Sequence, residues 1–265
     1  LHVEIEDEDS LSERLNANRA VKPLDAAVIR LPHISNFTDF MPLEQHELLG
    51  VRYVQRAREL GRPDLVILPG TKNTMEDLLW LRQNGLEAAA LKLAHAGTPI
   101  LGVCGGYQML GQTLDDPQGT ESGRPMVLSG LGLLPTRTVF DAQKRRMQVR
   151  AAAQGELFGG ARLTGYEIHN GRTEVGGAPF CVLEDGTPEG CVNRNVFGTY
   201  LHGLFDSGEL TGALVRMLCA RKGISPTQTQ LMSMADYRQQ QFDLLADGVR
   251  QALDMGAVYR AINTA

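Results

Sequence analysis

Three short apolar runs rich in β-branched residues recur in the first half of this 265-residue chain. They are LDAAVIRLP at 24–32, DLVILPG at 64–70 and PILGVC at 99–104. Such runs are typical of strands buried on both faces of a parallel sheet. Between the second and third runs, residues 74–97 carry leucines at helical spacing, interrupted by Gly85. This spacing predicts two helical pieces bent at the glycine.

The segment before the second run, residues 41–61, predicts a helix or a helix and strand crossover. Residues 24–115 therefore form a βαβαβα pattern, which favours a doubly wound α/β fold with a mainly parallel sheet flanked by helices.

The second half of the chain has a different pattern. After Asp115 it is rich in Gly, Pro and Ser, and residues 146–158 and 165–175 then alternate like antiparallel strands. Residues 191–205 predict one more strand. From Ser207 on, helical periodicity returns, so we expect a loop-rich antiparallel portion followed by a helical C-terminus.

Composition excludes several functional classes. The net charge is −5, with Lys and Arg scattered, so we expect no nucleic-acid partner. The four cysteines form no CxxC pair, which argues against a metal site and a disulfide framework and fits a reducing cytoplasm. No apolar run reaches the roughly 20 residues that span a bilayer, so we expect a soluble protein without membrane contact.

The opening of the chain suggests how the protein is divided. Residues 1–22 are acidic and weakly apolar, as in a linker that leaves an earlier domain. We therefore expect a single domain over residues 23–265, preceded by a linker from a domain that this sequence does not include.

Cys104 stands where the third apolar run meets a predicted helix, beside Gly102, Gly105 and Gly106. A strand that enters a helix through such a sharp turn displays one side chain above the sheet edge, and only small neighbours permit that backbone. A thiol at the start of a helix is biased toward the nucleophilic thiolate. Cys104 is thus a candidate nucleophile, and the alternative is a small buried cysteine packed at a strand end.

A nucleophilic cysteine needs a base, and histidine is the usual choice. His202, in GTYLHGLF, ends a predicted strand and begins a loop, which favours a place at the carboxyl edge of the sheet. His169, in GYEIHNGR, is the competitor. The others, which we expect at surface or structural positions, are His2, His33, His46 and His95.

The reaction of a thiol with a carbonyl also needs backbone donors for the oxyanion. The N–H of Gly105 follows the nucleophile directly. Gly70, in LPGTKNT, ends a neighbouring strand and is the candidate for the second donor. The alternative for Gly70 is an ordinary turn between a strand and a helix.

Together these features resemble the class I glutamine amidotransferases, and within them the C-terminal glutaminase domains of cobyric acid synthases. The resemblance runs in order from about residue 24 to 205. Its stretches are AAVIRLPHISNFTDFMPLE, DLVILPGTKNTMEDLLWLR, PILGVCGGYQMLG, GYEIHNGRT and FGTYLHGLF.

The resemblance implies that Cys104 attacks the side-chain amide of glutamine and that His202 moves the protons. Gly70 and Gly105 would form the oxyanion hole, and Gln108 would help to hold the substrate. The stretch that includes His169 either lines the glutamine pocket, or faces a synthetase domain, or is a plain edge strand.

The resemblance further implies that the ammonia supplies an N-terminal ATP-dependent domain, which converts adenosylcobyrinic acid a,c-diamide to cobyric acid in cobalamin biosynthesis. The sequence contains no GxxxxGK(S/T) phosphate loop. We therefore expect ATP and Mg²⁺ to belong to that domain together with the corrinoid substrate, and no cofactor to belong to this one.

One residue departs from the family pattern. Triad amidotransferases carry a glutamate two residues after the histidine, and this chain has Leu204 there. The group that orients His202 is then open. Asp206 and Glu167 are candidates, although each is equally an ordinary loop or strand carboxylate.

Two other functions fit the same residues. The chain could be the glutaminase part of a sister enzyme, such as a cobyrinic acid a,c-diamide synthase or a lipid II amidotransferase, although ISNFTDF disfavours both. It could also be a non-catalytic docking module in which Cys104 is inert.

Overall fold

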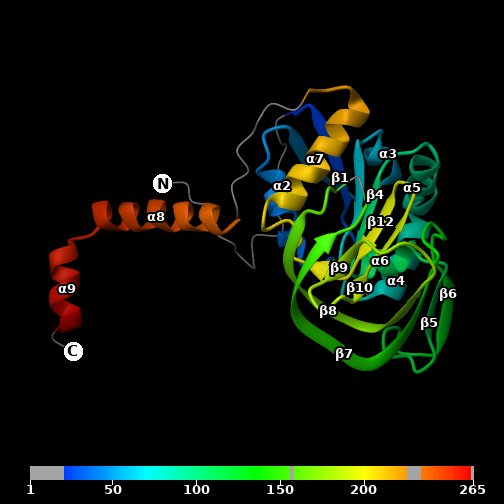
Figure 1. The fold of residues 1–265 in the computed structure, drawn as a ribbon. Coiled ribbons are helices and arrows are strands. Elements are labelled where there is room, and N and C mark those ends of the chain that lie inside the picture. The colour runs from blue at the N-terminus through cyan, green and yellow to red at the C-terminus, as the bar shows by residue number, and fades with distance from the viewer. Residues whose placement is uncertain (1–20, 156–157, 226–233, 264–265) are drawn as a thin grey trace.

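A computed structural model describes residues 21–155, 158–225 and 234–263 of the chain (Figure 1). Its centre is a six-stranded sheet in the order β11-β12-β4-β3-β1-β2, parallel except for β11. The strands are β1 (Leu24–Ile29), β2 (Leu49–Val54), β3 (Leu65–Leu68), β4 (Ile100–Val103), β11 (Cys191–Asn193) and β12 (Val196–Thr199).

Apolar residues cover both faces of this sheet, as expected for parallel strands. Successive residues of one strand point to opposite faces of the sheet and belong to two separate cores, as Val66 and Ile67 do. One core includes residues of α4 (Thr74–Gln83), α5 (Leu86–His95) and α6 (Gly105–Leu110), and the other includes residues of α7 (Glu209–Lys222) and the second sheet. Two short helices, α2 (Met41–Glu44) and α3 (Ala57–Leu60), flank β2.

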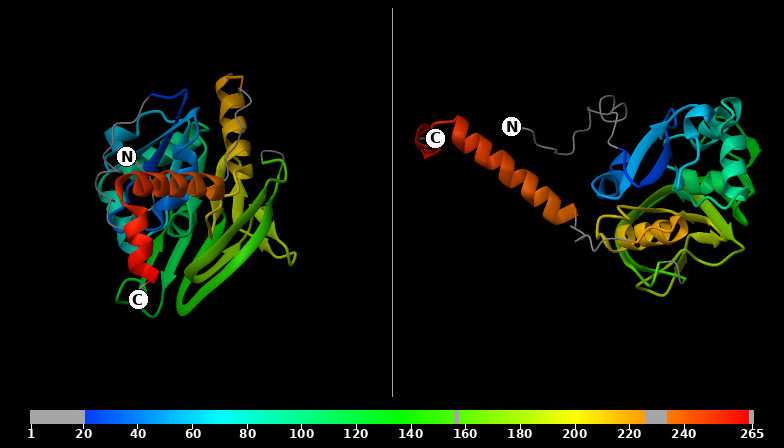
Figure 2. Two further views of the ribbon diagram at one scale, coloured as in Figure 1. Left: turned by 90° about the vertical axis from the view of Figure 1, so that its left-hand side faces the viewer. Right: turned by 90° about the horizontal axis from the view of Figure 1, so that it is seen from above.

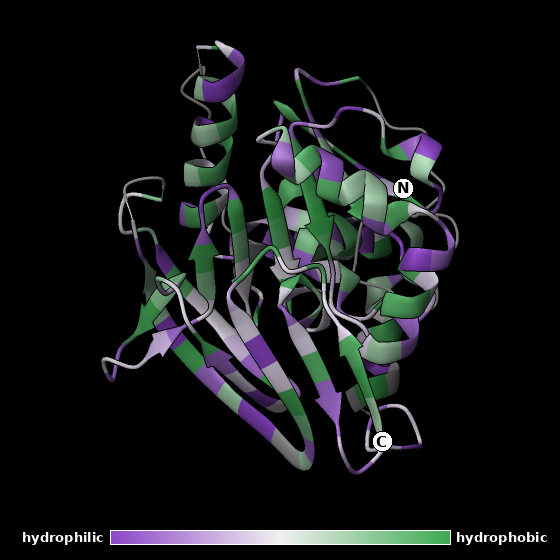
Figure 3. Cartoon of the chain, turned by 90° about the vertical axis from the view of Figure 1, so that its right-hand side faces the viewer, coloured by the Kyte–Doolittle hydropathy of each residue, from purple (hydrophilic) through white to green (hydrophobic). Residues whose placement is uncertain are grey.

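The second sheet is mainly antiparallel and is built around one long hairpin. Its hairpin strands are β7 (Thr136–Ala153) and β8 (Arg162–Val175), with a register shift between Val139 and Lys144. The other strands are β5 (Thr113–Asp116), β6 (Met126–Ser129), β9 (Cys181–Leu183), β10 (Pro188–Glu189) and β13 (Leu201–His202). Figure 3 shows the central strands as mostly hydrophobic and the hairpin strands as banded, which fits a sheet with one solvated face.

Two helices extend away from the body of the protein, α8 (Met234–Ala252) and α9 (Met255–Asn263) (Figures 1 and 2). At the start of α8, Gln45 Nε2 donates to Tyr237 Oη at 3.2 Å. Large apolar side chains along both helices are exposed, namely Phe242, Leu244, Leu245, Val249, Leu253, Tyr259 and Ile262. We call α8 and α9 together the C-terminal arm.

The structure confirms the predicted fold class, including the two helices separated at Gly85, which has φ 70°. The prediction of one strand over residues 191–205 was wrong, because the segment forms β11, β12 and β13. The chain leaves the central sheet after β12 and pairs with β8 in the second sheet. This change of sheet places His202 between the two sheets. Within the described residues, no helix is long and apolar enough to cross a membrane.

Candidate active site

Four adjacent central strands, β12, β4, β3 and β1, deliver the candidate residues to one edge of the sheet. The strands are parallel, so their carboxyl ends meet at that edge, which is where open α/β sheets bind ligands. In strand order, the residues that follow them are His202, Cys104, Gly70 and the segment 34–40. The structure therefore brings the predicted nucleophile and base together with a segment to which the sequence assigned no catalytic role.

The backbone at Cys104 has the geometry of a sharp elbow. Its φ is 52° and its ψ −112°, an uncommon conformation for a residue other than glycine. A Cβ on Gly106 would lie 2.0 Å from Leu68 O, and one on Gly102 would lie 2.8 Å from Gly106. Glycine is thus required at both positions because α6 packs directly against β3 and β4.

The Cys104 side chain is 8% exposed and faces the second sheet. Its Sγ donates to Ile168 O of β8 at 3.5 Å, and its backbone N–H donates to Thr199 O of β12 at 2.8 Å. The thiol is therefore held between the central sheet and the long hairpin.

His202 forms its closest polar contact with Asp39, a residue of the short 3₁₀ helix η1 (Phe37–Phe40). His202 Nδ1 lies 2.7 Å from Asp39 Oδ2, and Gly203 N donates to Asp39 Oδ1 at 2.9 Å. Asn36 Nδ2 lies 3.0 Å from the same ring nitrogen. Among the described residues, His202 Nε2 has no hydrogen-bond partner.

Several interactions set the pKa of His202. Burial alone would lower it, but the hydrogen bond with Asp39 and the charges of Asp39 and Cys104 outweigh burial and raise the pKa of His202 to about 10. The imidazole is therefore stabilised in its protonated form.

Asp206 and Glu167, the sequence-based candidates for orienting His202, do not contact its ring in the structure. Glu167 Oε2 pairs with Arg145 Nε at 2.7 Å. The register sets Tyr166, its neighbour on β8, opposite His202, so Glu167 points to the other face of the strand. Asp206 lies 3.9 Å from Arg238 of α8.

The two candidate oxyanion donors lie close to Cys104 and His202. A Cβ on Gly70 would lie 3.2 Å from His202 Cε1, and one on Gly105 would lie 2.6 Å from Thr71 Cγ2. The end of β3 is therefore packed against both His202 and the start of α6. Their role as donors stays a prediction.

Gln108 is buried in the pocket wall and is largely engaged in internal hydrogen bonds. Its Nε2 donates to Asn170 O at 3.0 Å and to Tyr200 Oη at 3.2 Å, and its Oε1 accepts from Thr74 Oγ1 at 3.1 Å. Both amide hydrogens are thus used, which leaves only acceptor capacity on Oε1 for a ligand.

The stretch GYEIHNGRT forms a wall of the active site. A Cβ on Gly165 would lie 2.2 Å from His202 O, so glycine permits the close approach of β13. Ile168, His169 and Asn170 line the pocket. The His169 ring stacks on Tyr200 with centroids 3.6 Å apart, and burial lowers the pKa of His169 to about 4, so it is neutral near pH 7.

Sequence reasoning missed Glu121, which belongs to the loop after β5. Asp116 is fully buried and accepts hydrogen bonds from the N–H groups of Thr120, Glu121 and Ser122, which fixes this loop. Glu121 Oε1 accepts from Thr74 N at 2.6 Å, and burial raises the pKa of Glu121. A carboxylate in a Gly-rich and Ser-rich loop gives no sequence signal of its distance to the thiol.

These groups surround a pocket of about 380 Å³. Its lining consists of Ser35, Asn36, Thr71, Lys72, Thr74, Cys104, Gln108, Glu121, Phe140, Ile168, His169, Asn170 and His202. The pocket therefore combines a thiol and an imidazole with both a cationic and an anionic side chain. A molecule that carries an amide together with ammonium and carboxylate groups matches this set of side chains.

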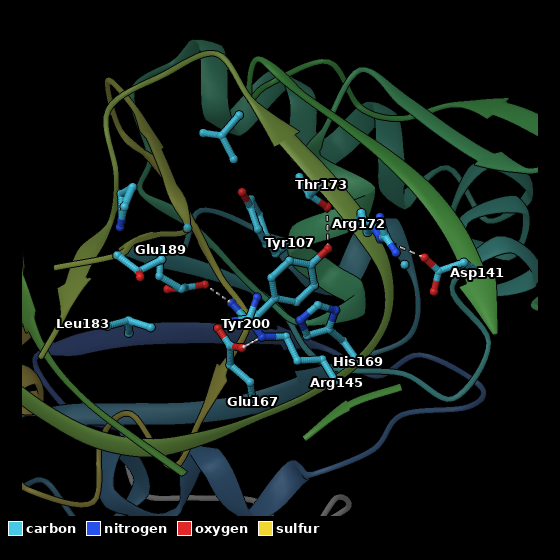
Figure 4. Close-up of a pocket in the computed structure, with 15 residues that line it drawn as sticks. Tyr107, Asp141, Arg145, Glu167, His169, Arg172, Thr173, Leu183, Glu189 and Tyr200 are labelled. Carbon is cyan, nitrogen blue, oxygen red and sulfur yellow. Dashed lines mark hydrogen bonds and ion pairs between the residues drawn. The ribbon is translucent and has the colours of Figure 1, made fainter. Parts of the chain in front are cut away.

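A larger cavity of about 480 Å³ shares His169 with this pocket (Figure 4). Its walls include the ion pair of Arg145 and Glu167. Since Cys104 and His202 line the smaller pocket, we assign the chemistry there. Within the described parts of the chain, no group of three or more His, Cys, Asp or Glu side chains is arranged to hold a metal ion.

Comparison with known proteins places these residues in a family context. Residues 25–210 match the sequence model of a family described as the CobB/CobQ-like glutamine amidotransferase domain. Proteins named cobyric acid synthase are similar over almost the whole chain. Those of Ruminiclostridium cellulolyticum and Salmonella typhimurium are each 44% identical over 99% and 98% of this chain, which corresponds to 53% of each relative. The chain thus spans about half the length of these relatives.

Solved structures support the same fold at lower identity. The structure of PurLQS from Thermotoga maritima gives a TM-score of 0.56 at 19% identity and covers 76% of this chain and 100% of that chain. A crystal structure of a glutamine amidotransferase gives a TM-score of 0.51 at 18% identity and covers 75% of this chain and 99% of that chain. These likenesses concern the fold alone.

Proposed function

Because this chain belongs to the family of CobB/CobQ-like glutamine amidotransferase domains, we propose that its pocket hydrolyses glutamine through a thioester on Cys104 and that the ammonia supports cobyric acid formation. The observation that carries the catalytic part is that the strained Cys104 elbow and the buried His202 line the same pocket. The relatives named cobyric acid synthase support the product.

In the proposed first step, the Cys104 thiolate, which protonated His202 stabilises, attacks the side-chain carbonyl carbon of glutamine and forms a carbon–sulfur bond. The carbonyl oxygen becomes an oxyanion next to the N–H groups of Gly105 and Gly70. His202 Nε2 gives a proton to the amide nitrogen, and the carbon–nitrogen bond breaks to release ammonia. The product is a glutamyl thioester.

In the second step, water adds to the thioester carbonyl and passes a proton to His202 Nε2. The carbon–sulfur bond breaks, glutamate leaves, and the proton on His202 restores the starting Cys104 and His202 pair. The same donors at Gly70 and Gly105 serve both oxyanions.

Two acceptor groups suit the α-ammonium of the substrate. The Glu121 carboxylate and the remaining acceptor site of Gln108 Oε1 lie on the wall formed with Thr74. Lys72, which also lines the pocket, suits the α-carboxylate. This division would select an amino acid over a simple amide.

The relatives are about twice as long as this chain, and we place the ATP-dependent amidation in the remainder of such a protein. ATP, Mg²⁺ and the corrinoid substrate adenosylcobyrinic acid a,c-diamide would bind there. This domain would then contribute ammonia alone.

The test is labelling with an electrophilic glutamine analogue, 6-diazo-5-oxo-L-norleucine, read by intact mass and peptide mapping. We expect one adduct on Cys104 that excess glutamine suppresses and that is absent in Cys104→Ser. An adduct on Cys181, Cys191 or Cys219 that glutamine leaves unchanged would contradict the proposal. The absence of any adduct when the full-length protein is labelled in the presence of its acceptor substrates would also contradict the proposal.

A further inference from the structure

We infer that Asp39 is the positioning residue for His202, in place of the glutamate that other triad amidotransferases carry two residues after the histidine. The inference rests on the glutaminase function proposed above. Leu204 at the usual position is fully buried in the apolar core and has no group that could contact the imidazole.

The contacts define what Asp39 does. An ionised carboxylate only accepts hydrogen bonds, so the proton at the 2.7 Å contact lies on His202 Nδ1. Nε2 is then the ring nitrogen that exchanges protons with the reacting groups. The second carboxylate oxygen accepts from Gly203 N at 2.9 Å, so Asp39 fixes the ring and the backbone that follows it.

Burial makes this contact strong. The side chains of His202 and Asp39 are 1% and 4% exposed, so water screens their interaction little. Besides Asp39 on η1, the titratable groups facing the imidazole come from two other elements: Cys104 at the elbow, and Tyr166 and His169 on β8. Asp39 is the carboxylate in contact with the ring.

The backbone explains how a residue far away in sequence reaches the base. After β1 the chain crosses to the end of β3, where Ser35 N donates to Gly70 O at 2.9 Å. Asn36 then turns with φ 51° and begins η1, which carries Asp39. The acid thus approaches His202 from the side of β1, whereas a residue two places after the histidine would approach along its own strand.

The test is a pH titration of the His202 imidazole in this chain by ¹⁵N nuclear magnetic resonance, with the signal assigned by His202→Gln. In the wild type we expect a proton on Nδ1 and a pKa well above 6.5. In Asp39→Asn, which keeps the shape but removes the charge, we expect that pKa to fall by at least about 2 units. We also expect glutaminase kcat to fall at least about 100-fold with KM changed less than about threefold.

Asp77→Asn is the matched control. Asp77 is fully buried and lies 2.8 Å from Nδ1 of another histidine, the partly exposed His33, so the variant removes a second carboxylate–imidazole contact elsewhere in the protein. The control should leave the His202 titration unchanged. A His202 titration that is the same in Asp39→Asn and the wild type would overturn the inference.

If Asp39→Asn does not fold, the wild-type spectrum still decides. A neutral His202 near pH 7 with its proton on Nε2 would refute the role of Asp39. Failure of the glutamine analogue to label Cys104 would instead count against the glutaminase function, and the two results are independent.

Discussion

The ring of Tyr166 stacks on the imidazole of His202, with ring centroids 5.3 Å apart and 26° between the ring planes. The two residues lie opposite each other on paired strands of the second sheet. The long hairpin therefore covers one face of the His202 imidazole, while Asp39 contacts Nδ1 at the edge of the ring.

Replacing Tyr166 tests the contribution of this stacking. Tyr166→Phe keeps the ring, so we expect kcat within about twofold of wild type, whereas Tyr166→Ala leaves the imidazole free to tilt and should lower kcat roughly 10-fold. Steady-state release of glutamate measures both. Equal losses in the two variants would show that the hydroxyl matters and not the ring.

Glu121→Gln should weaken substrate binding. The amide oxygen can still accept from Thr74 N, but the charge opposite the proposed ammonium is lost, so KM for glutamine should rise about 10-fold to 100-fold with little change in kcat. Alkylation of Cys104 by iodoacetamide, which lacks an ammonium group, is the control and should proceed at the wild-type rate. A fall in kcat at constant KM would exclude this role.

Gly106→Ala should be strongly destabilising. The new Cβ would lie 2.0 Å from Leu68 O, so α6 must move away from β3, and we expect a loss of about 3 kcal/mol or more in the free energy of unfolding. Gly186→Ala is the comparison, because no atom lies within 4 Å of its Cβ position and only its φ of 84° opposes alanine, at about 1 to 2 kcal/mol. Urea unfolding of both variants measures the difference, and similar losses would argue against close packing at the elbow.

The pKa of His202 predicts how stability depends on pH. A folded-state pKa of about 10 lies above the unfolded value of about 6.5, so the stabilisation is complete below pH 6.5 and is lost as the pH rises toward 10. The stability difference between wild type and His202→Gln should therefore shrink by about 4 kcal/mol between pH 6.5 and pH 10. Urea unfolding of both proteins across this range gives the difference, and a constant value would mean that His202 is neutral in the fold.

Removal of residues 226–265 should leave the body of the protein folded. The apolar side chains of the C-terminal arm are 37% to 64% exposed in the described structure, so they add little to the two cores. We expect a change in Tm of less than about 2 °C by calorimetry. A drop of 10 °C or more would show that the arm packs against the body.

Much of the fold could be predicted from the sequence because patterns within a few neighbouring residues determine these helices, strands and turns. Buried strands such as β3 are short apolar runs, and the break at Gly85 follows from a residue that accepts positive φ. The elbow at Cys104 was also predictable from local sequence, because glycines on both sides of a residue indicate close backbone contacts there.

Contacts between distant segments could not be predicted in this way. Nothing in the sequence around Asp39 indicates that it meets His202, because the contact depends on the order of β1, β3, β4 and β12 in the sheet. The departure of the chain from the central sheet after β12 also has no local signal. Glu121 was missed because the loop that carries it is fixed by hydrogen bonds to a buried carboxylate and not by apolar periodicity.

The place of β12 in the sheet has a consequence for synthesis of the chain. β12 comes late in the sequence yet lies directly beside β4, where its Thr199 carbonyl accepts the backbone N–H of Cys104. A nascent chain that ends before β12 therefore leaves that flank of β4 unpaired. The segment that closes this flank also carries His202, so the backbone partner of Cys104 and the imidazole both become available only when β12 and β13 have been synthesised.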